Sequence, residues 1–117
     1  MSDEMPQVKL LYSDEFKARL RSLAKRYRKI QEDLQPLLKD LQSRNFEGDQ
    51  LSETGDNPFF KVRLKNSDIR KGKSAGYRMI YEVRASVCVL LIMIYSKSDQ
   101  NTIAAGKIRE IIAEFDR

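Results

Sequence analysis

Closely spaced basic side chains are the feature of this sequence with the clearest chemical meaning. The segment from Phe59 to Lys97 holds nine of the 22 basic residues of the chain but only two of its 17 acidic residues. The net charge of +5 is therefore concentrated in this segment. A compact basic surface on a small protein is typical of one that binds a polyanion. The nine residues are Lys61, Arg63, Lys65, Arg70, Lys71, Lys73, Arg78, Arg84 and Lys97.

The composition argues against most kinds of metal and cofactor site. The chain has no histidine and a single cysteine, which argues against a zinc site. The acids of the basic segment, Asp68 and Glu82, form a weak ligand pair for magnesium. The run RKGKSAGYR (70–78) is not a nucleotide-binding P-loop, because it lacks the initial glycine and leads into a strand. We expect neither a metal nor a cofactor.

The hydrophobic periodicity predicts the elements that must position these residues. Alternating apolar residues indicate strands, and apolar residues three and four apart indicate helices. Ser13 or Asp14 supplies an N-cap for the first helix. Pro36 either kinks the second helix or lies in its early turns after a later start. The expected order is a strand (8–12), two helices (14–27 and 29–44), a loop (45–58), three strands (60–65, 77–84 and 87–95) and a last helix (102–115).

This β-α-α-β-β-β-α order predicts an α+β fold in a single domain, residues 1–117, with an antiparallel sheet and helices on one sheet face. The strand at 87–95 is apolar on both faces, so we expect it in the centre of the sheet. Its apolar run is about half the length of a membrane span, which predicts a soluble protein without a membrane partner. Cys88 lies in this run and is expected to be a buried small hydrophobe, in keeping with a reducing cytoplasm.

Strand alternation predicts where the basic side chains point. Lys61, Arg63 and Lys65 project from one face of their strand, because successive side chains alternate between faces. Tyr77 and Tyr81 are expected in the core. A solvated face that only keeps the protein soluble is the alternative interpretation of the same bases. The other candidates follow in the loop at 66–76 and the next two strands: Arg70, Lys71, Lys73, Arg78, Tyr95 and Lys97.

The runs FKVRLKNSDIRKGKSAGYRMIYEV (60–83), LLIMIYSKSDQ (90–100) and IREIIAEF (108–115) resemble the RelE/ParE superfamily of toxins from bacterial type II toxin–antitoxin systems. The resemblance extends over essentially the whole chain and favours the RelE-like branch with mRNA-cleaving members. It implies a cytoplasmic, ribosome-dependent endoribonuclease (an mRNA interferase) that inhibits translation. It also implies a cognate antitoxin as partner and mRNA on the ribosome as substrate, and leaves the homo-oligomeric state open.

The resemblance also implies roles for single residues. Arg78 matches the arginine of the family's GYR strand, which stabilises the transition state. Lys71 and Lys73 fall where the family has loop lysines, and Tyr95 and Lys97 match the polar end of the fourth strand.

Two positions differ from the pattern of the family. Ser98 stands where some members carry a second arginine. Ala104 or Ala105 stands where some members carry a tyrosine near the last helix. A tyrosine role would therefore move to Tyr95 or be absent.

Such a mechanism is chemically coherent without histidine. RNA brings its own nucleophile, the 2′-hydroxyl, so the protein needs to align it and to stabilise charge on the phosphoryl oxygens. Arg78 suits the second task, because its planar guanidinium matches a phosphate. Lys71 or Lys73, crowded by other cations, could act as general base. Tyr95 could donate a proton or stack on a base. The remaining basic candidates, expected to bind RNA, are Lys61, Arg63, Lys65, Arg70 and Lys97.

Two other functions fit the same resemblance. One is a non-enzymatic toxin on the same fold that inhibits DNA gyrase, although such members tend to lack the basic cluster. The other is a catalytically weak homologue that only binds nucleic acid, which the positions without the second arginine and the late tyrosine favour.

Overall fold

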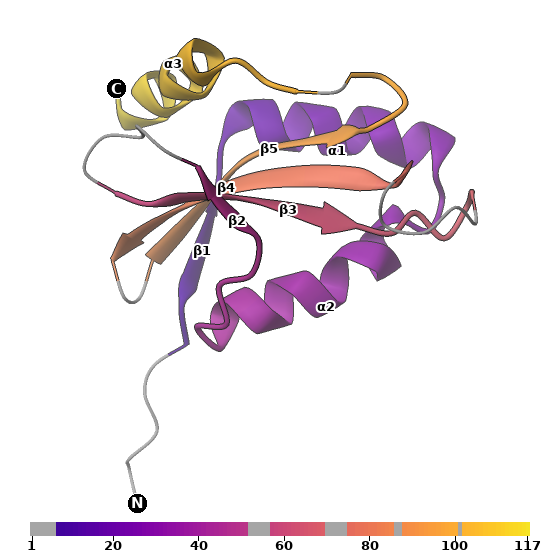
Figure 1. Cartoon of the computed structure of the whole chain (residues 1–117), viewed down its shortest axis with the longest axis horizontal. Coiled ribbons are helices and arrows are strands. Elements are labelled where there is room, and N and C mark those ends of the chain that lie inside the picture. The colour runs from indigo at the N-terminus through magenta and orange to yellow at the C-terminus, as the bar shows by residue number, and fades with distance from the viewer. Residues whose placement is uncertain (1–6, 52–56, 70–74, 86–87, 101) are drawn as a thin grey trace, which may run out of the picture.

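The computed structural model of the chain describes residues 7–51, 57–69, 75–85, 88–100 and 102–117 (Figure 1). The α+β class is confirmed, and each helix and strand expected from the sequence is present. The elements are β1 (Lys9–Tyr12), α1 (Asp14–Arg26), α2 (Ile30–Gln42), β2 (Asp49–Leu51), β3 (Phe59–Leu64), β4 (Tyr77–Ala85), β5 (Cys88–Ser96) and α3 (Ala105–Asp116).

The five strands form one sheet in the order β1-β5-β4-β3-β2. The segment β3-β4-β5 is the expected antiparallel meander, with β4 and β5 in the interior of the sheet. The strand β1 differs from the expected antiparallel arrangement, because it pairs with β5 in parallel. The two helices between β1 and the meander carry the chain across the sheet, and this crossover makes a parallel pairing possible.

The strand β2 corrects the expectation of a loop throughout 45–58. It pairs antiparallel with Phe59–Lys61 of β3. Gly48 leads into it with a φ of 111°, a left-handed conformation that glycine adopts without strain. A β-carbon at Gly48 would also lie 2.6 Å from the carbonyl oxygen of Lys61. A glycine is therefore required where β2 approaches β3.

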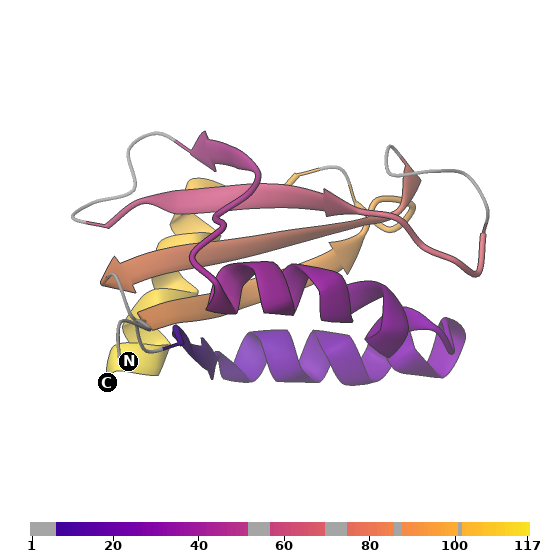
Figure 2. The same cartoon turned by 90° about the horizontal axis from the view of Figure 1, so that it is seen from below.

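The helices cover both faces of the sheet, so the expectation of helices on one face was wrong. Helices α1 and α2 pack on the face that carries Met79 and Leu91, whereas α3 packs on the face that carries Ile80 and Met93. Figure 2 shows α1 and α2 together on one side of the strands and α3 behind them. The reason is β5, whose side chains are apolar in both directions and must be covered on both faces.

Local hydrogen bonds fix where α1 begins relative to the sheet. Ser13 is the N-cap, and its hydroxyl oxygen accepts a hydrogen bond from the backbone N–H of Phe16 at 2.9 Å. The same hydroxyl donates to the carbonyl oxygen of Ile92 at 2.7 Å, and the group is buried. Ser13 therefore joins the start of α1 to the middle of β5.

The structure decides two expectations about single residues. Pro36 lies inside α2, which begins at Ile30, so the alternative of a later helix start is excluded. Cys88 is only half-buried rather than buried, because it is the first residue of β5 at the edge of the core. Within the described ranges, no helix has the length and apolar character that crossing a membrane requires.

Candidate functional site

Arg63, Arg78 and Tyr95 form a row across three adjacent strands. Arg63 of β3 lies opposite Arg78 of β4, and Arg78 lies opposite Tyr95 of β5. Side chains of directly opposed residues lie on the same sheet face, with β-carbons about 4.5–5.5 Å apart. This face is the one that α3 partly covers, because Tyr95 belongs to the cluster that contains Ile108 of α3. The pairing thus brings together three of the candidates expected from the sequence.

Arg78 is a buried cation beside another cation. Its side chain is only 5% exposed, whereas Arg63 is exposed. Burial, and then the positive charge of Arg63, lower the pKa of Arg78. One guanidinium nitrogen donates a hydrogen bond to the carbonyl oxygen of Tyr77 at 3.2 Å, which helps to orient the group. A phosphate bound between Arg63 and Arg78 would offset both the burial and the repulsion.

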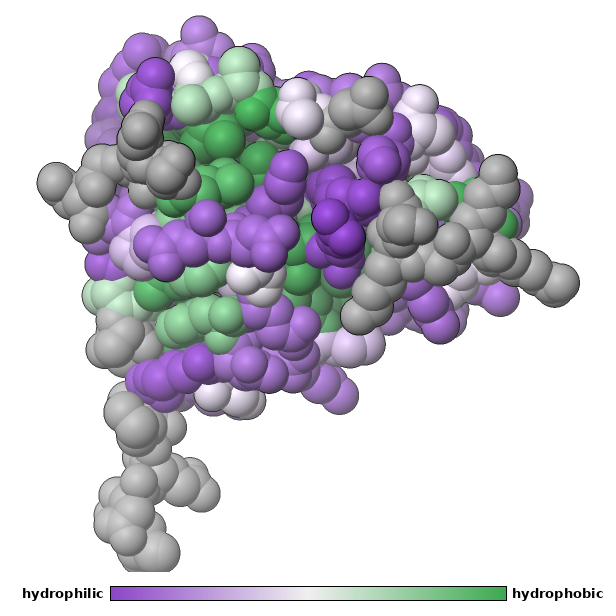
Figure 3. Space-filling model, viewed as in Figure 1, coloured by the Kyte–Doolittle hydropathy of each residue, from purple (hydrophilic) through white to green (hydrophobic). Residues whose placement is uncertain are grey.

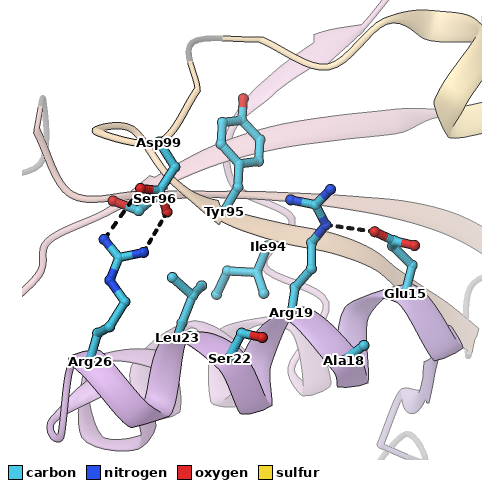
Figure 4. Close-up of a pocket in the computed structure, with 10 residues that line it drawn as sticks. All are labelled: Glu15, Ala18, Arg19, Ser22, Leu23, Arg26, Ile94, Tyr95, Ser96 and Asp99. Atoms are coloured by element: carbon cyan, nitrogen blue, oxygen red, sulfur yellow. Dashed lines mark hydrogen bonds and ion pairs between the residues drawn. The ribbon is translucent and has the colours of Figure 1, made fainter.

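Tyr95 closes the row at its buried end. The residue is 2% exposed, and burial raises the pKa of its phenol, although the nearby Arg78 opposes the shift. Figure 4 shows the ring on the side of β5 away from α1, whereas Ile94 points toward Leu23. The phenol of Tyr95 is therefore protonated at neutral pH.

Three lysines flank this row, Lys61 within β3, Lys65 directly after β3 and Lys97 directly after β5. Lys61 and Lys65 lie two residues before and after Arg63, and Lys97 lies two residues after Tyr95. The period of two places the side chains of Lys61 and Arg63 on one face of β3. Figure 3 shows strongly hydrophilic side chains gathered where β3 ends, next to hydrophobic ones. The arrangement forms a basic surface with a buried arginine at its centre.

A network of hydrogen bonds holds the chain that follows β3. The carboxylate of Asp33 in α2 accepts hydrogen bonds from the backbone N–H and the hydroxyl of Ser67, at 2.9 and 2.5 Å. The carboxylate of Asp68 accepts one from the backbone N–H of Lys29 at 3.1 Å. These hydrogen bonds fix residues 66–69 to the beginning of α2. Sequence reasoning missed Asp33 and Ser67, because nothing in the local pattern links residues so far apart.

Gly76 fixes the return of the chain into β4. A β-carbon at this position would lie 2.0 Å from the carbonyl oxygen of Leu64, so no side chain fits there. The carbonyl oxygen of Gly76 also accepts a hydrogen bond from the backbone N–H of Lys97 at 2.9 Å. Gly76 therefore allows the close packing of the strands that sets the position of Arg78.

Several candidates are not part of this row. Arg70, Lys71 and Lys73 lie outside the described residues, so their predicted roles stay predictions. Arg84 belongs to a separate network at the other end of β4, where it bonds Glu82 at 2.7 Å and Asp116 of α3 at 2.8 Å. Asp116 first, and Glu82 after it, raise the pKa of Arg84.

The tyrosines expected in the core are there. Tyr77 and Tyr81 are fully buried, and the hydroxyl of Tyr81 donates a hydrogen bond to the carbonyl oxygen of Glu47.

The two acids of the basic segment do not converge. Asp68 contacts the start of α2, whereas Glu82 accepts hydrogen bonds from Asn57 and Arg84. Across the ranges that the structure describes, no group of three or more acidic, histidine or cysteine side chains is arranged to hold a metal ion.

Comparison with known proteins identifies a solved structure whose fold is similar to that of this chain. No protein-family model and no curated protein sequence matches the chain. Among solved structures, it is similar to the E. coli toxin RelE, determined in the free state as a mutant with two arginines replaced by alanine. The TM-score is 0.51 with 20% sequence identity, and the match covers 94% of this chain and 97% of that chain.

The chain therefore has a RelE-like toxin fold, as the resemblance of its sequence predicts. At 20% identity the likeness defines the fold and not the activity.

Proposed function

We propose that this protein is a toxin of a type II toxin–antitoxin module, a cytoplasmic endoribonuclease that cleaves mRNA on the ribosome without a metal ion. The observation that carries the proposal is the row of Arg63, Arg78 and Tyr95 on one sheet face. Two arginines beside each other suit a phosphate, and a protonated phenol beside them suits a leaving oxygen. The solved protein of similar fold is named a toxin, which supports the same class.

The reaction that fits these groups is an internal transfer within the RNA. The 2′-oxygen attacks the adjacent phosphorus, forming an O2′–P bond while the P–O5′ bond breaks. The proton of the 2′-hydroxyl passes to a base, for which Lys71 and Lys73 are the predicted candidates. Arg78 stabilises the charge that develops on the phosphoryl oxygens. Tyr95 gives its proton to the departing O5′, so the products are a 2′,3′-cyclic phosphate and a 5′-hydroxyl.

The burial of Tyr95 argues against a role in base stacking. A ring that is 2% exposed offers no free face to a nucleobase. Burial also raises the pKa of the phenol, which keeps the transferable proton in place at neutral pH. Burial lowers the pKa of Arg78, but a guanidinium is so strongly basic that Arg78 remains a cation at neutral pH.

A cognate antitoxin is the expected protein partner. It must cover the basic surface around Arg63 when the toxin is silent, so we expect acidic residues at that interface. Such an interface would raise the association rate and make this rate fall with increasing salt.

Mapping of transcripts after a short pulse of expression tests the proposal. Cuts inside translated codons, absent in the Arg78→Ala variant, are the expected result. Double-strand breaks at stalled gyrase without RNA cuts would indicate instead a gyrase inhibitor on the same fold. If neither appears while the protein still binds RNA, the chain is a catalytically weak homologue.

A further inference from the structure

Among the residues that the structure describes, β1 leaves one edge of the sheet unpaired. It is outermost beside β5, and Figure 2 shows it as the short indigo strand directly before α1. The opposite edge is β2, which has only three residues and is mostly exposed and polar. Short, polar edges resist pairing with another chain, whereas an apolar edge favours it. The segment Leu10–Tyr12 is largely apolar and half-buried, so β1 is the edge suited to bind a further strand.

Backbone hydrogen bonds show which groups of β1 point away from the sheet. The N–H of Ser13 donates to a carbonyl oxygen of β5, whereas the N–H of Val8 donates to the last residue of α2, both at 3.1 Å. Successive N–H groups of a strand alternate between its two edges, so those of Leu10 and Tyr12 point outward like that of Val8. Within the described ranges, the outward backbone groups of Leu10 and Tyr12 have no hydrogen-bond partner.

One antiparallel register of two β1 strands uses all of these outward groups. It places Leu10 opposite Tyr12 of a second copy and Leu11 opposite itself, so the opposed residues exchange both of their hydrogen bonds. The next register in one direction would need Val8, whose N–H is already bonded to α2. The next register in the other direction would need Asp14, which begins a helix. The edge is therefore complementary to itself about a two-fold axis.

The charged residues at the two ends of β1 match in the same register. Lys9 is exposed and would lie opposite Ser13 of the second copy, beside Asp14 of that copy. Asp14 is exposed as well, and neither Lys9 nor Asp14 takes part in an ion pair within the part of the chain that the structure describes. The two-fold axis would form the pair of Lys9 with Asp14 twice. Only a second copy of the same strand matches the charges in both directions.

We propose that two copies of this chain associate through β1 and form one continuous sheet with five strands from each copy. The inference goes beyond the proposed function and needs neither RNA nor an antitoxin. Directly opposed residues share a sheet face, so Leu11 and α3 of both copies lie on the same side of the sheet. The row of Arg63, Arg78 and Tyr95 lies on this side too, so the dimer presents both rows in one direction.

The dimer is expected to be weak and to leave the proposed active site open. The interface lies beside Cys88–Leu91, the first part of β5, whereas Tyr95 lies near the other end of that strand. A contact between two short strands buries less than the about 1,200 Å² of a stable protein interface. We therefore expect a reversible dimer with a dissociation constant on the order of 10–100 µM.

Sedimentation velocity of the purified full chain over a range of concentrations measures the dimer. The variants are Lys9→Glu, Asp14→Lys and the combination of both. Each single reversal opposes like charges twice across the axis, so we expect the dissociation constant to rise at least about tenfold. The double reversal restores opposite charges and should return the dissociation constant close to that of the parent. Lys39→Glu, at an exposed lysine of α2, is the matched control and should not change it.

Cysteine cross-linking tests the register in a Cys88→Ala background. Leu11→Cys places the two thiols at a non-hydrogen-bonded pair, whose α-carbons lie about 4.5 Å apart and within reach of a disulfide. Leu10→Cys is the matched control, because its two copies would lie more than about 7 Å apart, too far for a disulfide. We expect a covalent dimer of the Leu11→Cys variant under mild oxidation and none of the Leu10→Cys variant.

Several results would overturn the inference. One is a chain that stays monomeric up to about 1 mM. Another is a dimer that the charge reversals leave unchanged, or one in which Leu10→Cys cross-links as readily as Leu11→Cys. If the chain stays monomeric while Lys9→Glu weakens antitoxin binding, the edge serves the antitoxin and the inference is wrong. Circular dichroism verifies folding, and the charge reversals decide the question if Leu11→Cys destabilises the protein, because they change only exposed side chains.

Discussion

Arg78 lies directly opposite Tyr95 in the pairing of β4 with β5, and both side chains are almost completely buried. A cation beside a phenol changes the pKa of that phenol. Burial raises the pKa of Tyr95, while the charge of Arg78 opposes this shift. This pair is where charge stabilisation and proton transfer can meet on one phosphate.

Replacing Arg78 should remove most of the activity. We expect Arg78→Ala to lower mRNA cleavage by about 10²–10³ and to relieve growth arrest, because one transition-state donor is removed. Arg78→Lys keeps the charge without the planar fork and should restore only part of the rate. Arg109→Ala, an exposed arginine of α3, is the matched control, and thermal melting verifies folding. An Ala variant as toxic as the parent at equal protein level would show that Arg78 is not catalytic.

Removing only the hydroxyl of Tyr95 tests the proton donor. Tyr95→Phe should lower the cleavage rate by about 10²–10⁴ and leave the melting temperature close to that of the parent. The raised pKa means that a donor at Tyr95 is protonated at all pH values below its ordinary value of 10.0. Tyr95 should therefore cause no decrease of rate between pH 7 and about 9. Full activity of the Phe variant would exclude the donor role.

The ends of the cleaved RNA distinguish this mechanism from metal-assisted hydrolysis. Attack by the 2′-hydroxyl leaves a 2′,3′-cyclic phosphate or 3′-phosphate on one fragment and a 5′-hydroxyl on the other. End-specific labelling of the fragments measures this directly. A 5′-phosphate, or cleavage abolished by a chelator under conditions that keep the ribosome intact, would contradict the mechanism.

Alkaline pH should unfold the protein through its buried tyrosines. Burial raises the pKa values of Tyr77, Tyr81 and Tyr95 in the folded protein. The contribution of these groups to the free energy of unfolding is therefore complete below about pH 10, and it is lost as the pH rises through their pKa values in the folded protein. Tyr81→Phe removes one of these groups and should reduce the pH slope by up to about 1.4 kcal/mol per pH unit. Urea melts from about pH 8 to about pH 11 measure the slope, and an unchanged slope would contradict this assignment.

Two glycine substitutions test the packing at the start of β4. Gly76→Ala should destabilise the protein by about 1–3 kcal/mol or more, because the new methyl group would overlap the carbonyl oxygen of Leu64. Gly106→Ala in α3 is the control, since nothing lies within 4 Å of its β-carbon position. We expect the control to be neutral or up to about 1 kcal/mol more stable. Denaturant unfolding compares the two, and equal stabilities would refute the close approach at Gly76.

The order of elements could be predicted from the sequence, because apolar residues recur at clear intervals along most of the strands and helices. The strand β2 could not, because Asp49–Leu51 is too short and too polar to show alternation. The row of Arg63, Arg78 and Tyr95 depends on the register between the strands, and the residues between β3 and β4 carry no sequence pattern that defines this register.

The parallel pairing of β1 with β5 has a consequence for synthesis. The first strand to leave the ribosome finds its partner only when the last strand has been made, and α1 packs on that same late strand. Interactions between distant parts of a chain form slowly and late. The row of Arg63, Arg78 and Tyr95 also needs β5, so a nascent chain cannot hold an assembled site until almost all of it has emerged. Under the proposed function, mRNA cleavage by this chain therefore begins only after β5 has been made.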